Sequence, residues 1–193
     1  ADEPRRPFRG HLSGVLKAFQ SEGFATLWIA YFFYFSTLAV MPNLSLQTRV
    51  AMGRDPKEVS GAVLALRFGV KALAGFLLGG LTMKKGVKAP VLATVLLLGS
   101  ALVWAAVARG WLYLFTFGLM GAGELGGAYF PNYLIAISSM AGNPLNQAVL
   151  VLATPASSIA PVLHGYLTET FDVSASLVLG GVTIALALLL ILR

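Results

Sequence analysis

Long apolar stretches separated by short polar joints set the pattern along this chain. A helix that spans a bilayer needs about 20 mostly apolar residues. Six windows of the sequence meet this requirement, and they run from Phe24 to Thr48, Val59 to Leu81, Pro90 to Ala108, Trp111 to Ser138, Gln147 to Leu167 and Ser174 to Leu192. Lipid leaves no backbone group unpaired, and these windows are too long and too continuously apolar for barrel strands. The pattern therefore predicts an all-α membrane protein, a bundle of six transmembrane helices.

The residues before the first window follow an amphipathic pattern instead. Apolar side chains recur there at three- and four-residue spacing, at Phe8, Leu12, Val15, Leu16 and Phe19. Arg9 and Lys17 occupy the remaining arc, which is typical of a basic helix lying in the cytoplasmic membrane interface. The alternative is a short solvated helix packed on protein. We expect residues 1–22 to form a cytoplasmic linker with this interfacial helix, and residues 23–193 to form the transmembrane bundle.

Composition supports the membrane assignment and narrows the chemistry. The chain has 193 residues, of which 57% are apolar and only 11% are charged, and its mean hydropathy is +0.78. Soluble domains carry roughly 25% charged residues, so this chain has too little polar surface for a water-soluble globule. It has no cysteine and only two histidines, and it contains neither a P-loop nor a G-x-S-x-G motif. We expect no catalytic residue, no metal site, no cofactor and no enzymatic activity.

The positive charge of the chain is interpreted as a topology signal. The formal net charge is +6, and the basic residues gather at the ends of the apolar windows, which favours membrane lipid over nucleic acid as the partner. Eight of them fall on the side of the two termini and four on the opposite side, beside Asp55, Glu58, Glu169 and Asp172. The positive-inside rule then places both termini in the cytoplasm. We expect a multi-pass protein of the plasma (inner) membrane.

Three ionisable residues lie inside the apolar windows, where charge is costly and is usually paired or functional. Arg67 and Lys71 are four residues apart on one face of the second window, and Glu124 lies in the fourth. At 1.5 Å per residue, Lys71 and Glu124 lie about 18 Å and about 20 Å below the outer ends of their helices, so the depths predict an ion pair. Two interpretations stay open: an anion or proton site inside the bundle, or a buried pair that only fixes helix register. His164, near the outer end of the fifth window, is a weaker candidate for a coupling role.

Glycine and proline inside the windows predict close helix packing and kinks. Gly123 and Gly127 in the fourth window, like Gly75 and Gly79 in the second, have the four-residue spacing that lets helix backbones approach. Prolines interrupt several windows, which leaves carbonyl groups without a donor and favours kinks. These prolines are Pro42, Pro131, Pro155 and Pro161. Several kinked helices suit a moving bundle better than a static anchor.

Two sequence patterns are similar to those of a known family. Gly79, Leu81, Lys84, Gly86 and Lys88 fit the signature G-x-L-x-D-R-x-G-R-[KR], from which Met83 and Val87 depart. The stretch from Ala160 to Leu167 is similar to the pattern G-P-x-x-G-G-x-L, with Ala160 and His164 in two glycine positions. With the glycine-rich fourth window and the amphipathic segment before the first, the chain resembles one six-helix half of a major facilitator superfamily transporter, most like the C-terminal half.

This resemblance implies a fold and a function. The family pairs two six-helix bundles around a substrate site near the bilayer midplane, so we expect a second half in the same polypeptide or in a partner chain. The expected function is secondary active transport of a small solute by alternating access, with protons as one option for coupling.

The resemblance also suggests roles for individual residues. Glu124 would titrate protons or form an ion pair, and Arg67 and Lys71 would meet an anionic substrate group or balance Glu124. Tyr31 and Tyr34, for which aromatic packing is the alternative, and Asn132 would line the cavity. The rival hypothesis is a non-transporting membrane subunit with a structural or assembly role, in which the three charges satisfy one another.

Overall fold

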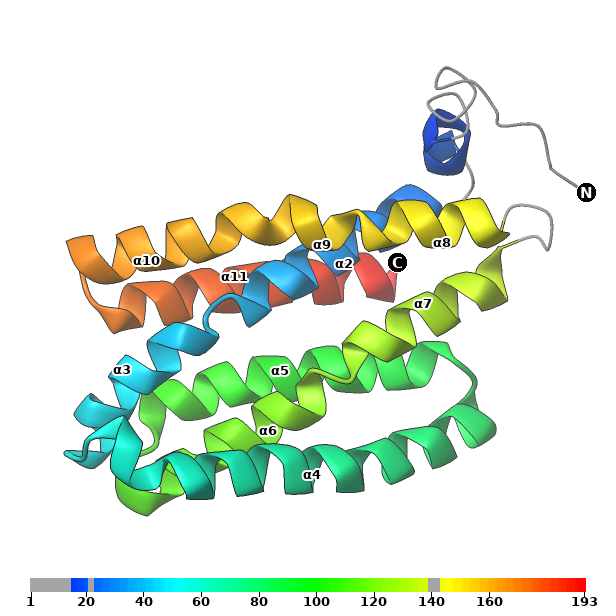
Figure 1. The fold of residues 1–193 in the computed structure, drawn as a ribbon. Helices are drawn as coiled ribbons and strands as arrows, with labels where there is room; N and C mark the ends of the chain where they lie inside the picture. The colour runs from blue at the N-terminus through cyan, green and yellow to red at the C-terminus, as the bar shows by residue number, and fades with distance from the viewer. Residues whose placement is uncertain (1–14, 21–22, 139–142) are drawn as a thin grey trace, which may run out of the picture.

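The protein is helical throughout the part that the structure describes (Figure 1). The structure is a computed structural model that describes residues 15–20, 23–138 and 143–193. Helices account for 90% of these residues, and no strand occurs among them. The all-α prediction is therefore confirmed over these ranges.

Five of the six predicted windows correspond to one helix or to a run of helices. The second, third and sixth windows form α4 (Pro56–Lys85), α5 (Lys88–Val107) and α11 (Val173–Leu192). The first is divided into α2 (Phe24–Leu38) and α3 (Met41–Met52), which meet at a bend of 40°. The fifth is a run of α8 (Asn143–Val151), α9 (Ala153–Ala156), the 3₁₀ helix η2 (Ser157–Ile159) and α10 (Ala160–Thr170).

The fourth window, predicted as one span, is interrupted instead. It forms the 3₁₀ helix η1 (Gly110–Leu114), α6 (Phe115–Gly123) and α7 (Gly126–Ile137), with Glu124 and Leu125 between the last two. In Figure 1, α6 and α7 follow one another and together run from one end of the bundle to the other. Among the described residues, four helical segments are long and apolar enough to cross a membrane, or five if α2 and α3 count as one span. The predicted fourth span is not among these candidates, because its residues are divided among three short helices.

The connections between the helices gather at two ends of the molecule. The α4–α5 connection lies at the right in Figure 1, and the α3–α4, α5–η1 and α10–α11 connections lie at the left. Lys84, Lys85 and Lys88 therefore lie at the opposite end from Arg109 and Asp172. This separation agrees with the two sides used in the charge count, and the cytoplasmic placement of the lysine-bearing end stays a prediction.

The helices pack around α11 and α6. α11 lies against α2 and α5, and α6 lies against both α4 and α5. Only 11% of the apolar window of α4 is buried, and Phe76 on this helix is 83% exposed. α4 therefore lies at the edge of the bundle and presents apolar surface that lipid or another apolar helix must cover.

The amphipathic segment is described only in part, because Phe8, Leu12 and Arg9 lie outside the described residues. Residues 15–20 form a helical turn and a half, and the Phe19 ring lies edge-on to Phe24 and Trp28 at centroid distances of 5.4 and 5.5 Å. Part of this segment therefore packs on α2.

The signature residues after the second window lie mainly on helices. α4 continues four residues beyond the predicted end at Leu81, so Gly79, Leu81 and Lys84 are helical. Gly86, with φ +78°, ends α4, because its left-handed backbone is one that favours glycine. Lys88 already begins α5.

Asp55 begins α4 at the other end. Its carboxylate accepts hydrogen bonds from the Lys57 backbone N–H at 3.0 Å and from Arg49 Nη2 at 2.7 Å. The Lys57 N–H, followed by the Arg49 side chain, holds the pKa of Asp55 below its usual value. The cap satisfies an N–H that the first helical turn leaves without a partner.

Candidate functional site

Arg67, Lys71 and Glu124 form one ion-paired cluster, which we call the charged triad. Arg67 donates to Glu124 Oε1 from Nε at 2.8 Å, and its Nη2 lies 2.6 Å from the same oxygen. Lys71 Nζ donates to Glu124 Oε2 at 2.9 Å. The predicted pairing of Lys71 with Glu124 is therefore present, and Arg67 shares the same carboxylate.

The triad lies at mid-helix on α4 and at the break between α6 and α7. Lys71 is about 22 Å from Pro56 and about 21 Å from Lys85 at 1.5 Å per residue. Glu124 immediately follows α6. The Glu124 side chain is 10% exposed, whereas those of Arg67 and Lys71 are 27% and 33% exposed. The carboxylate is thus enclosed, and the two cations remain partly accessible from outside this chain.

The charges of the triad do not cancel. Two cations share one carboxylate, so the cluster carries a formal charge of +1. Charge-assisted bonds to both oxygens offset part of the cost of taking these groups out of water. An anionic group that approaches Arg67 or Lys71 would find positive charge to neutralise. Loss of the negative charge on Glu124 would leave two cations together in an apolar surrounding, which favours opening of the cluster.

The break beside Glu124 leaves backbone carbonyls that two tyrosines satisfy. In a continuous helix the Gly127 N–H would donate to the Gly123 carbonyl, but here it donates to the Glu124 carbonyl at 3.1 Å. The Gly123 carbonyl accepts a hydrogen bond from Tyr34 Oη at 2.9 Å. The Gly127 carbonyl has no helical donor four residues on, because Pro131 lacks an N–H. It accepts from Tyr31 Oη at 3.3 Å.

Tyr31 and Tyr34 therefore serve the core of the bundle. Both are buried, with 4% and 0% exposure, and both rings pack on Phe130 at 4.8 and 5.2 Å between centroids. Asn132, the third predicted cavity residue, is exposed on α7. The structure does not bring these three side chains together in one cavity.

Glycines hold the halves of the broken helix close to their neighbours. A Cβ on Gly121 would overlap the Arg67 carbonyl of α4, and one on Gly123 would lie 3.0 Å from Leu98 of α5. A Cβ on Gly126 would lie 2.8 Å from the Tyr34 ring. These approaches place the Glu124 carboxylate within reach of α4. The predicted contact at Gly75 and Gly79 is absent, since nothing described lies within 4 Å of a Cβ at either position.

His164 lies in a second polar cluster, at the bend between α2 and α3. It is 1% exposed, with Nδ1 2.7 Å from Ser176 Oγ and Nε2 3.2 Å from the Ser36 carbonyl. Because a carbonyl only accepts, Nε2 carries a proton, and in the neutral ring Nδ1 then accepts from the Ser176 hydroxyl. Asn43 Nδ2 donates to Ser176 Oγ at 2.8 Å and to the His164 carbonyl at 3.2 Å. His164 thus joins α10 to α2 and α11, and with Asn43 to α3.

This second cluster was not predicted from the sequence. The sequence pattern indicates His164 alone and assigns no role to Asn43 or Ser176. The available signal was polar side chains inside apolar windows, where an unpaired amide is costly and a partner is expected. Which of the many serines and threonines would supply that partner depends on how the helices pack.

Three of the four predicted proline kinks coincide with a change in helical structure. Pro42 is the second residue of α3, just after the 40° bend. Pro155 lies in the four-residue helix α9, and Pro161 is the second residue of α10. Pro131, in contrast, lies inside the helix α7, which continues through it; the carbonyl that it leaves without a helical donor is present at Gly127, and the kink at Pro131 stays a prediction. The Tyr31 hydrogen bond to the freed carbonyl explains why the helix continues.

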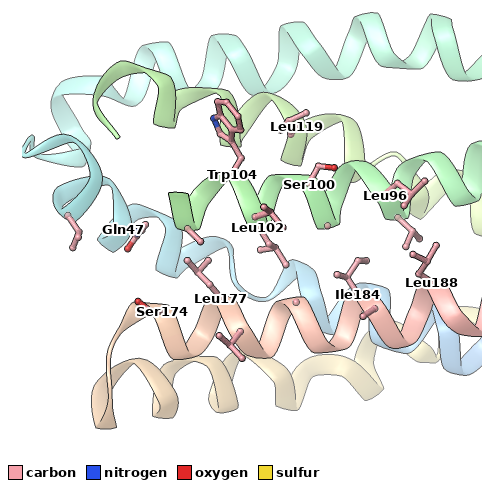
Figure 2. A pocket seen from close by; sticks show the side chains of 18 of the residues that line it. Gln47, Leu96, Ser100, Leu102, Trp104, Leu119, Ser174, Leu177, Ile184 and Leu188 are labelled. Atoms are coloured by element: carbon pink, nitrogen blue, oxygen red, sulfur yellow. The ribbon is translucent and has the colours of Figure 1, made fainter. Parts of the chain in front are cut away.

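A cavity of about 740 Å³ lies between α5 and α11, away from the charged triad (Figure 2). Its lining is mostly aliphatic and contains neither the triad nor Tyr31 and Tyr34. Among the described residues, no group of three or more His, Asp or Glu side chains could hold a metal ion.

Comparison with known proteins adds no relative. No family model, no curated protein and no solved structure matches this chain. The interpretation of the site therefore depends on its geometry and on the sequence patterns above.

Proposed function

We propose that this chain is the C-terminal half of a secondary active transporter of the major facilitator type, which moves a small solute across a membrane by alternating access. The main observation that supports this proposal is the charged triad, in which Arg67 and Lys71 form salt bridges with Glu124 beside the α6–α7 break. Ionised groups at mid-depth of a membrane bundle are typical of substrate and ion pathways. Broken helices at that depth are typical of transporter binding sites.

The triad suggests how such a site would work. Its formal charge of +1 and the partial exposure of both cations favour a solute with an anionic group. That group would compete with Glu124 for Arg67 and Lys71, and proton binding to Glu124 would release the cations in the same way. The α6–α7 junction, next to Glu124, is where a change in pairing would alter the angle between two helix halves.

The proposal includes a second six-helix half, in the same polypeptide or in a partner chain, and a plasma-membrane location with both termini in the cytoplasm. The exposed face of α7, which includes Ala128 and Asn132, would then line the cavity between the halves.

The rival function is a non-transporting structural subunit, and one observation favours it. Each charge of the triad has a partner within the cluster, as expected of a buried network that only fixes helix register. A test must therefore ask whether water reaches the triad from both sides of the membrane.

Cysteine accessibility tests the two functions directly, because the chain has no native cysteine. Single-cysteine proteins Ala128→Cys and, as a control on α11, Leu189→Cys would be treated with a membrane-impermeant maleimide in right-side-out and in inverted vesicles. Transport predicts that Ala128→Cys reacts from both sides and Leu189→Cys from neither. Reaction of Ala128→Cys from one side only, or from neither, would favour the structural subunit.

The role of Glu124 is tested in the same vesicles. Adding Glu124→Gln to Ala128→Cys should change the ratio of labelling from the two sides at least threefold, because the unpaired cations destabilise the closed cluster. Glu124→Asp, which keeps the charge, is the matched control and should change it less. An unchanged ratio in a folded Glu124→Gln protein would remove Glu124 from the mechanism.

A further inference from the structure

The cavity between α5 and α11 has a polar end and a long apolar body (Figure 2). Gln47, Arg109 and Ser174 lie at the end where α3, α5 and α11 come together, and Leu96 and Leu188 line the far part. The lining from Ser174 to Leu188 covers about 21 Å of α11 at 1.5 Å per residue. We call this cavity the α5–α11 slot.

Two glycines make room in the slot. Among the described residues, a Cβ on Gly181 would meet nothing within 4 Å, and one on Gly99 would meet only Ile184 Cγ2 at 3.7 Å. The side chains along the edges are exposed, with Leu96 at 54% and Val103 at 66%. In a membrane-spanning bundle such a slot opens sideways to hydrocarbon, so its natural occupant is a flexible apolar chain.

The polar end of the slot has the chemistry of a headgroup site. Arg109 is exposed, and within the part of the chain that the structure describes no carboxylate lies within 4.0 Å of it, the salt bridges being Arg49–Asp55 and the triad. Its Nη1 donates to the Ala106 and Ala108 carbonyls at 3.1 and 2.9 Å, which holds the guanidinium in place. The remaining N–H groups match a phosphate.

Neighbouring residues fit the level of the lipid headgroups. Trp104, 37% exposed, lines the slot and donates its indole N–H to the Leu112 carbonyl at 2.8 Å. Tryptophan is enriched where membrane meets water, because one end of its ring is apolar and the other polar. Asp172, two residues before Ser174, accepts a hydrogen bond at Oδ1 from the Ala175 N–H at 3.1 Å.

We propose that the α5–α11 slot is a binding site for an anionic phospholipid of the surrounding bilayer. One acyl chain lies along α5 and α11 over Gly99 and Gly181, and the phosphate lies at Arg109. The site is separate from the charged triad and does not depend on the transport proposal. It differs from general lipid contact in having one cation at the headgroup end and a preformed apolar slot below it.

The test is a lipid titration of the detergent-solubilised protein, with bound lipids counted by native mass spectrometry. The two probes are phosphatidylglycerol and phosphatidylcholine with the same acyl chains. One basic residue near an anionic lipid is worth about fivefold in binding, so phosphatidylglycerol should bind about fivefold more tightly than phosphatidylcholine. Arg109→Gln should remove this preference, and Arg54→Gln, a charge control outside the slot, should keep it.

Filling the slot provides the second measurement. Gly181→Leu should weaken binding of both lipids at least threefold, and Ser100→Leu, also in the lining, should do the same if the first variant does not fold. Gly69→Leu on α4, where a Cβ also meets nothing within 4 Å, should bind like the unchanged protein.

Three results would overturn the proposal. They are equal affinity for the two lipids in the unchanged protein, equal effects of Gly181→Leu and Gly69→Leu, and a protein dimer that Gly181→Leu dissociates. The last result would assign the slot to a second copy of the chain.

Discussion

Replacing Gly121 by alanine should destabilise the protein through a clash between helix backbones. Gly121 lies on α6 where α6 meets α4, and an added Cβ would overlap the Arg67 carbonyl while lying 2.9 Å from its carbon and 3.0 Å from Arg67 Cγ. A flexible side chain could turn away from such a contact, but a helical carbonyl cannot. α4 and α6 must therefore separate, which also moves Arg67 relative to Glu124.

The expected magnitude follows from the kind of atom that is in the way. Overpacking a well-packed site costs typically 1–3 kcal/mol, and a backbone obstacle places Gly121→Ala at about 2–3 kcal/mol. For a chain of this size, 1 kcal/mol corresponds to about 2–4 °C in melting temperature. We expect the Gly121→Ala protein to melt about 5–10 °C below the unchanged protein in the same detergent.

The control is Gly79→Ala on α4, where a Cβ meets nothing within 4 Å. Alanine is the better helix former by up to about 1 kcal/mol, so this variant should melt at the same temperature or slightly higher. Gly118→Ala should fall between the two, because its Cβ would lie 3.0 Å from Val70 Cγ2, a side-chain atom. Equal melting temperatures for Gly121→Ala and Gly79→Ala would refute the packing argument.

Two further predictions concern hydrogen bonds. Tyr34→Phe leaves the buried Gly123 carbonyl unsatisfied and should lower the free energy of unfolding, measured by heat or denaturant, by about 1–3 kcal/mol. Tyr31→Phe loses a longer bond of 3.3 Å and should lower it less. The reverse order would contradict the role of Tyr34 at the break. The pKa of Asp55 in the folded protein is lowered, first of all by the Lys57 N–H. The Asp55 carboxylate therefore stabilises the folded state at pH values above the pKa of about 3.9 that it has in the unfolded chain. This contribution is lost as the pH falls through the lower pKa of the folded state. Asp55→Ala should therefore lower the melting temperature at pH 7, with a gap that closes in scans below about pH 4, and a gap that stays constant with pH would exclude the charge as its origin.

The apolar segments that form the long helices α4, α5 and α11, and the Lys71–Glu124 pair, could be predicted because they depend on local quantities. Apolar length is a property of consecutive residues, and the predicted sixth window from Ser174 differs from α11 by one residue at its start. A constant rise per residue converts sequence position into depth. Two opposite charges at equal depth in an apolar bundle then have a strong reason to meet, and they do.

The position of the helix break could not be predicted in this way. Pro131 carries the strongest sequence signal in the fourth window, yet α7 continues through it and the chain breaks at Glu124. The outcome depends on donors from α2, since Tyr31 and Tyr34 supply the hydrogen bonds at these carbonyls. Nothing in the local sequence indicates that a tyrosine about 90 positions earlier faces the break.

Glycine shows the same division between local and tertiary control. The spacing of Gly75 and Gly79 equals that of Gly123 and Gly127, but a Cβ at either of the first pair meets no described atom within 4 Å, whereas one at Gly123 would lie 3.0 Å from Leu98. Hydrophobic length, helical rise and charge placement are properties of consecutive residues. The sequence therefore predicts the apolar segments, the side of the bundle on which each connection lies and the depth of the charges. Three other features depend on helices far apart in the chain, because each needs atoms that only packing brings within a few ångströms. They are the glycines that touch a neighbouring helix, the carbonyls that find a donor and the position of the slot between α5 and α11.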